Sequence, residues 1–108
     1  MAQWNREQLI LAFEFFHGCP EATQTDAHPT CARIAAEISG AGPLRSAGAV
    51  DKILRNIKQA GHGSAGLPHA SKLIQELASQ FADPENRAIL NLEAAEIRTR
   101  WGLPSLVC

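Results

Sequence analysis

The chain has 108 residues, of which 45 % are hydrophobic and 19 % charged, and its formal net charge is −1. This length predicts one globular domain with a single core, and this composition excludes a disordered chain. No apolar run reaches the roughly 18 residues of a membrane-spanning helix, and the polar N-terminus argues against a secretory signal peptide. The cysteines, Cys19, Cys31 and Cys108, lack zinc-ligand spacing, so we expect reduced thiols in a cytoplasmic protein.

Apolar residues recur at positions i, i+3, i+4 and i+7, as on one face of an amphipathic helix. The first predicted helix follows Asn5, a good N-cap residue, and ends at Gly18. Its inward face is expected to contain Leu9, Ala12, Phe13 and Phe16, with Trp4 and Leu9 as a hydrophobic staple. The second helix is predicted from Pro29 to Gly40, with an inward face of Cys31, Ile34, Ala35 and Ile38.

The second half of the chain continues the same pattern. A third helix is predicted from a Ser46 cap to Gly61, with Val50, Ile53, Leu54 and Ile57 facing inward. The inward residues of the fourth helix are Ala70, Leu73, Ile74, Leu77 and Phe81. Asp83 and Pro84 predict the start of a C-terminal helix over residues 83–101, with inward residues Leu90, Ala94, Ile97 and Trp101. No stretch alternates with a period of two, so the sequence predicts an all-α fold, a single compact domain of about five helices over residues 1–108.

Positive charge is concentrated in residues 45–72, which we call the basic stretch. It contains five Lys and Arg residues and one acid, whereas residues 1–44 and 73–108 both carry more acids than cations. The face of the third helix opposite its apolar residues is expected to carry Gly48, Lys52, Arg55, Asn56 and Gln59. Cations can contact DNA phosphates, amides can pair with base edges, and the helix start at residues 45–48 offers N–H groups to a phosphate. An ordinary solvated helix face is the alternative interpretation.

Catalytic and metal-binding motifs are not found in the sequence. The histidines have no metal-ligand spacing, and neither a phosphate-binding loop nor a nucleophile elbow is present. Glu14 and Glu37 are expected to face solvent, and Cys31 to be a buried small hydrophobe. The sequence therefore predicts no enzyme, no cofactor and no metal site; a small enzyme with a histidine–cysteine pair is the remaining catalytic hypothesis.

Three strings, in the same order and at similar gaps, resemble a bacterial protein family. Residues 4–12, WNREQLILA, resemble the W-[TN]-R-E-[EQ]-L-[IL]-L-A-L opening of the domain that precedes HNH nuclease domains in modification-dependent restriction endonucleases. Residues 45–57 are similar to the R-N-P-x-x-V…L-x-N-[FI] helix of that domain, and residues 63–81 to its G-x-G-L-x-x-[AG]-S-K-L…E-x-x-x-x-F segment. The resemblance covers about residues 4–82. It departs at Ser46 and Ala47, where the family has Asn-Pro, and at Lys52, which is displaced by one position from the family's lysine.

The resemblance implies a sensor of modified double-stranded DNA in a restriction system, with the HNH nuclease in a fused or separate domain. Such domains sense 5-methylcytosine, 5-hydroxymethylcytosine or phosphorothioate linkages. The shortage of aromatic residues free to capture a flipped base favours the phosphorothioate backbone here. We expect the distinguishing group to be held by Arg45, Ser46, Ala47 and Gly48. Phosphates or base edges are expected at Lys52, Arg55, Asn56, His62, Ser71 and Lys72, with Arg6 as a lesser candidate.

A helical protein-interaction or dimerisation module is the alternative function. In that case the basic stretch would pair with an acidic partner, and the chain could form a homodimer. The sequence leaves the DNA modification, its sequence context and the oligomeric state open.

Overall fold

The computed structural model describes residues 4–19, 29–61 and 72–106, without the side chains of residues 29–32 and 59–61. The described residues form five α-helices and one 3₁₀ turn, and no strand occurs among them. The elements in chain order are α1 (Arg6–Gly18), α2 (Pro29–Ser39), α3 (Ala47–Gly61), α4 (Lys72–Phe81), η2 (Pro84–Asn86) and α5 (Arg87–Trp101). The radius of gyration, 12.7 Å, is that of one compact domain of this length. The predicted all-α fold is therefore confirmed.

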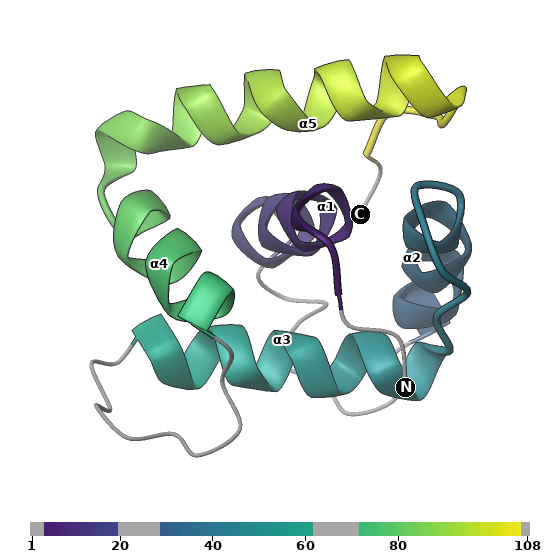
Figure 1. Cartoon of the computed structure of the whole chain (residues 1–108), viewed down its shortest axis with the longest axis horizontal. Coiled ribbons are helices and arrows are strands. Elements are labelled where there is room, and N and C mark those ends of the chain that lie inside the picture. The colour runs from purple at the N-terminus through teal and green to yellow at the C-terminus, as the bar shows by residue number, and fades with distance from the viewer. Residues whose placement is uncertain (1–3, 20–28, 62–71, 107–108) are drawn as a thin grey trace.

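Helix α1 lies at the centre of the molecule and the other helices surround it. Figure 1 shows α1 end-on, with α5 on one side, α3 on the opposite side, and α2 and α4 completing the frame. The sequence of α1 explains this position, because residues 8–13 and Phe15 are all buried and only an enclosed helix can be apolar on every side. The predicted single inward face of this helix was too narrow: Ile10, Leu11 and Phe15 are buried as well.

Local capping signals set the helix boundaries. The Oδ1 atom of Asn5 accepts a hydrogen bond from the Gln8 N–H at 2.7 Å, and the Oγ atom of Ser46 accepts one from the Ala49 N–H at 3.1 Å. Both predicted N-caps are thus confirmed. The predicted start of the last helix was wrong, because Asp83 instead caps the short η2 turn and α5 begins only at Arg87.

The predicted inward residues of α3 are buried, and so are Ile34, Ala35 and Ile38 of α2 and Ile74, Leu77 and Phe81 of α4. Ala70 and the side chain of Cys31 lie outside the described residues. The prediction fails at the end of α5. Leu90, Ala94 and Ile97 are buried, but Trp101 is 47 % exposed, and its indole N–H donates to Glu7 at 3.2 Å. Arg98 occupies the buried position instead, with an exposure of 4 %. A charged side chain is stable there because two carboxylates reach it from other helices.

These carboxylates belong to Glu14 of α1 and Glu37 of α2, and the three residues form what we call the Arg98 cluster. The Arg98 guanidinium bonds Glu14 at 2.8 and 2.9 Å, also bonds Glu37, and donates to the Pro104 carbonyl at 2.7 Å. Burial raises the pKa of the Glu14 carboxyl, although the neighbouring guanidinium acts in the opposite direction. The prediction that Glu14 and Glu37 face solvent was wrong: both lie against Arg98, with side-chain exposures of 11 % and 10 %.

Cys19, at the C-terminal end of α1, is 3 % exposed and takes part in a disulfide. The prediction of reduced cysteines was therefore wrong for this residue, and the cysteines no longer support a cytoplasmic location. The side chains of Cys31 and Cys108 lie outside the described residues. In the part of the chain that the structure describes, no helix is long and apolar enough to cross a membrane.

Candidate nucleic-acid interface

The outer face of α3 carries cations, as its sequence pattern predicted. Val50, Ile53, Leu54 and Ile57 are at most 6 % exposed, because this face packs on the core. Lys52, Arg55 and Gly48 are exposed on the other side, and Asn56 is half-buried. The Nε atom of Arg55 lies 3.1 Å from the Asp51 carboxylate, one turn away, whereas Lys52 has no ion pair within the described part of the chain. The side chain of Gln59 is outside the described residues.

The start of α3 is open on its outer side. A Cβ atom added at Gly48 would have only the Ser46 Oγ atom as a neighbour, at 3.9 Å. As at any helix start, the first-turn N–H groups of Ala47 and Gly48 have no acceptor within the helix. Ala47 itself is half-buried against the core. The segment Ser46–Gly48 thus combines a capping hydroxyl, backbone donors and a small apolar side chain.

Arg45, by contrast, is engaged inside the molecule. Its guanidinium carbon lies 4.7 Å from the centre of the Trp4 ring, and its Nε atom donates to the Gln8 Oε1 atom at 3.2 Å. Its backbone N–H donates to the Ser39 Oγ atom at 2.8 Å. We call Trp4, Gln8, Ser39 and Arg45 the Gln8 cluster. Stacking and hydrogen bonding together fix the Arg45 side chain against the start of α1.

Gln8 holds this cluster together. It is fully buried, and its amide donates to the carbonyls of Ile38 at 3.0 Å and Pro43 at 2.8 Å. The chain must approach closely for these bonds to form: a Cβ atom at Gly42 would lie 2.4 Å from the Asn5 side chain. The connection from α2 to α3 is therefore attached to α1, and Arg45 positions the start of α3.

The structure brings only part of the remaining predicted site together. Lys72 is exposed at the first residue of α4, which packs on α3. Arg6 instead bonds Glu93 of α5 at 2.7 Å, which ties it to the α5 side of the molecule. His62 and Ser71 lie outside the described residues. Among the residues that the structure describes, no group of three or more His, Cys, Asp or Glu could hold a metal ion.

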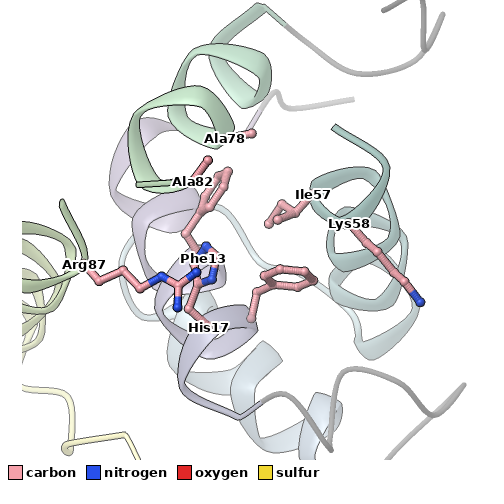
Figure 2. A pocket seen from close by; sticks show the side chains of 8 residues that line it. Phe13, His17, Ile57, Lys58, Ala78, Ala82 and Arg87 are labelled. Atoms are coloured by element: carbon pink, nitrogen blue, oxygen red, sulfur yellow. The ribbon is translucent and has the colours of Figure 1, made fainter. Parts of the chain in front are cut away.

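A pocket that the sequence analysis missed lies beside α3. Its volume is about 220 Å³, and Figure 2 shows the lining side chains, which come from α1, α3, α4, α5 and the residue after α4. They are Phe13, Phe16, His17, Ile57, Lys58, Ala78, Ala82 and Arg87. His17 directly follows the apolar residues of α1, and this position was the one local sign of the pocket in the sequence. Arg87 is far away in the sequence and no pattern connects the two.

Comparisons with known proteins add no assignment: no family model matches the chain, and neither a curated protein nor a solved structure is significantly similar to it. The resemblance to modification-dependent endonucleases stays a prediction based on the strings within residues 4–82.

Proposed function

We propose that this protein binds double-stranded DNA through the outer face of α3. The observation that carries the proposal is the exposure of Lys52 and Arg55 on the face opposite the buried Val50 and Leu54. Cations at this spacing suit phosphates along a duplex, and Lys72 at the start of the neighbouring α4 adds a further charge. Asn56, half-buried on the same helix, would be the residue for a base edge.

We further propose that the DNA is modified and that the protein is the sensor of a cytoplasmic restriction system. This part rests on the resemblance of residues 4–82, and it implies an HNH nuclease in a fused or separate domain. Phosphorothioate is the favoured modification, with 5-methylcytosine and 5-hydroxymethylcytosine as the other candidates. The sulfur atom is larger and a poorer hydrogen-bond acceptor than oxygen, so a small apolar surface beside N–H donors suits it. Ala47, with Ser46 and Gly48, offers this combination at the start of α3.

Arg45 changes its role in this proposal. Because its guanidinium is stacked on Trp4 and bonded to Gln8, we assign it as a positioning residue that holds Ser46–Gly48 in place. An Arg45→Ala variant would therefore lose stability as well as binding, and it cannot serve as a clean test of DNA contact.

A protein-interaction or dimerisation module is the second candidate function. In addition to the basic stretch, which would fit an acidic partner, α5 exposes Ile89 and Leu92 by 51 % and 64 %. They lie one turn apart and form a small apolar patch on α5, a helix that lies on the opposite side of α1 from α3 (Figure 1).

Mobility-shift assays at low salt with matched plain, methylated and phosphorothioate duplexes test the function. We expect binding to the phosphorothioate duplex to be strongest. Equal binding to all three would retain the DNA-binding proposal and remove the modification claim. Absence of binding to every duplex would overturn both and favour the interaction module.

A neutralised α3 tests the proposed surface. Lys52→Gln should weaken binding to all duplexes. The slope of log K against the logarithm of the salt concentration should fall in magnitude by about one, because one phosphate contact is lost. Arg100→Gln makes the same charge change on α5, where the side chain is 59 % exposed, and should leave DNA binding unchanged. Equal losses in the two variants would show that only net charge matters and that α3 is not the interface.

A further inference from the structure

The pocket between α1, α3, α4 and α5 has an apolar interior built from distant parts of the chain. Phe13 and Phe16 come from α1, Ile57 from α3, and Ala78 and Ala82 from α4 and the residue after it. The two alanines are the reason that space remains, because larger side chains at these positions would fill it. The volume of about 220 Å³ is below the roughly 300–1,000 Å³ of pockets for drug-sized ligands, so a single ring is the appropriate size.

The polar groups of the pocket lie on one side. In Figure 2 the guanidinium of Arg87 lies next to the imidazole of His17, while the Lys58 chain leads away along α3. None of the lining residues is acidic. The His17 ring also contacts Phe16 edge-on, with ring centres 5.1 Å apart, and stacks with Phe13 at 6.4 Å. Two nitrogen-rich side chains therefore border an aromatic surface.

Among the residues that the structure describes, Arg87 differs from the other arginines because no side-chain partner bonds its guanidinium. Arg6, Arg55, Arg98 and Arg100 bond carboxylates, Arg45 bonds Gln8, and Arg33 also has a bonded or electrostatic partner. Within the described part of the chain, Arg87 has neither an ion pair nor a side-chain hydrogen bond. Burial, together with the positive charge of Arg87, lowers the pKa of His17. The pocket thus has a positive edge, and no carboxylate among the described residues forms an ion pair with Arg87 there.

We propose that this pocket binds a small aromatic carboxylate, with the ring against the partly exposed Phe16 and the carboxylate at Arg87 and His17. A guanidinium can bond both oxygens of a carboxylate, and the imidazole can donate to one of them. Aromatic side chains provide both apolar area and favourable ring packing for a single ring. The proposal does not depend on DNA binding.

An NMR titration of the full chain with benzoate tests the site. We expect saturable shifts of backbone amides around His17, Ile57 and Arg87. Benzamide has nearly the same shape without the charge, and benzylamine has the opposite charge. Benzamide should bind at least about tenfold more weakly, because the charge-assisted contacts are lost, and benzylamine should not bind. Equal affinity for benzoate and benzamide, or chemical-shift changes at residues outside the pocket, would overturn the proposal. This test uses only the wild-type protein.

Substitutions test separately whether the charge of Arg87 and the space of the pocket are needed for benzoate binding. Arg87→Gln should lower benzoate affinity at least about tenfold, whereas Arg100→Gln, the same change further along α5, should leave it unchanged. Ala82→Phe should block the pocket without removing a charge, and because Ala82 is exposed the fold should tolerate the change. Circular dichroism verifies folding of each variant. Full affinity in Arg87→Gln or in Ala82→Phe, or an equal loss in Arg100→Gln, would place the ligand outside this pocket.

Discussion

Arg98 and Arg100 lie close together on α5 and show how strongly the surroundings decide what one side chain contributes. Arg98 has a side-chain exposure of 5 % and bonds Glu14, Glu37 and the Pro104 carbonyl. Arg100 has a side-chain exposure of 59 % and bonds Glu7 at 2.6 Å. A buried charge needs its partners because water cannot replace them, whereas an exposed ion pair competes with water and is screened by salt.

Arg98→Ala should lower the free energy of unfolding by about 3–5 kcal/mol, because it leaves Glu14 and Glu37 buried without their cation. Arg100→Ala should change it by at most about 1 kcal/mol. Urea unfolding of both variants measures the difference. Similar values for the two would mean that the Arg98 cluster does not hold its buried charges as described.

The surroundings of Arg45 could not be predicted from the sequence either. The concentration of cations predicted that Arg45 faces outward and binds DNA. Its side chain instead stacks on Trp4 and bonds Gln8. Residues that are distant in sequence create this environment, so the local string RSAG contains no sign of it. Glu14 and Glu37 were misjudged for the same reason, since their partner lies on α5.

The starts of α1 and α3 could be predicted, because their capping signals are local, whereas the start of α5 was predicted too early. Asn5 and Ser46 cap helices through side-chain bonds to residues three positions ahead, and Gly102, with φ of 68°, ends α5 in a left-handed conformation. The faces of α1 could not be predicted from periodicity, because the helix is apolar on nearly every side. Periodicity identifies a buried face only when an exposed face contrasts with it.

His17, on the C-terminal part of α1, makes the stability of the fold depend on pH. Burial and Arg87 lower its pKa in the folded state, so the unfolded chain binds a proton more readily below about pH 6.5. Stability should therefore fall as the pH drops from 6.5 through the lowered folded pKa. Urea unfolding at about pH 7.5 and about pH 5.5 should show a larger loss in the wild type than in His17→Gln.

Glu14 contributes with the opposite sign, because its pKa is raised in the folded state and its contribution to stability falls as the pH rises above 4.5. This residue is present in both proteins of that comparison, so its effect cancels. Identical pH dependence in wild type and His17→Gln would show that the imidazole titrates normally.

At the scale of the whole molecule, the two candidate sites differ in how far the sequence could anticipate them. The outer face of α3 follows from helical phasing within one segment. The pocket requires α1, α3, α4 and the first turn of α5 to meet, and only tertiary packing brings His17 and Arg87 together. Sites built from one helix can be anticipated from its pattern, and sites between helices cannot.

The disulfide at Cys19 gives a prediction for the intact chain. With three cysteines and one disulfide, one thiol remains. Titration with a thiol reagent in denaturant, without reductant, should therefore detect about one thiol per chain, and about three after reduction. Three thiols before reduction would show that all three cysteines are reduced, as the sequence predicted, and would again favour a cytoplasmic location.

The central position of α1 has a consequence for the order in which the backbone opens. Helices α2, α3 and α5 all pack on α1, and none of these three can leave without uncovering part of it. Amide hydrogens of α1 are therefore expected to exchange with solvent only in global unfolding, whereas the outer helices can fray separately. The segment 4–82 ends before α5 and would leave one side of α1 and Glu14 uncovered, so the smallest cooperative unit includes α5.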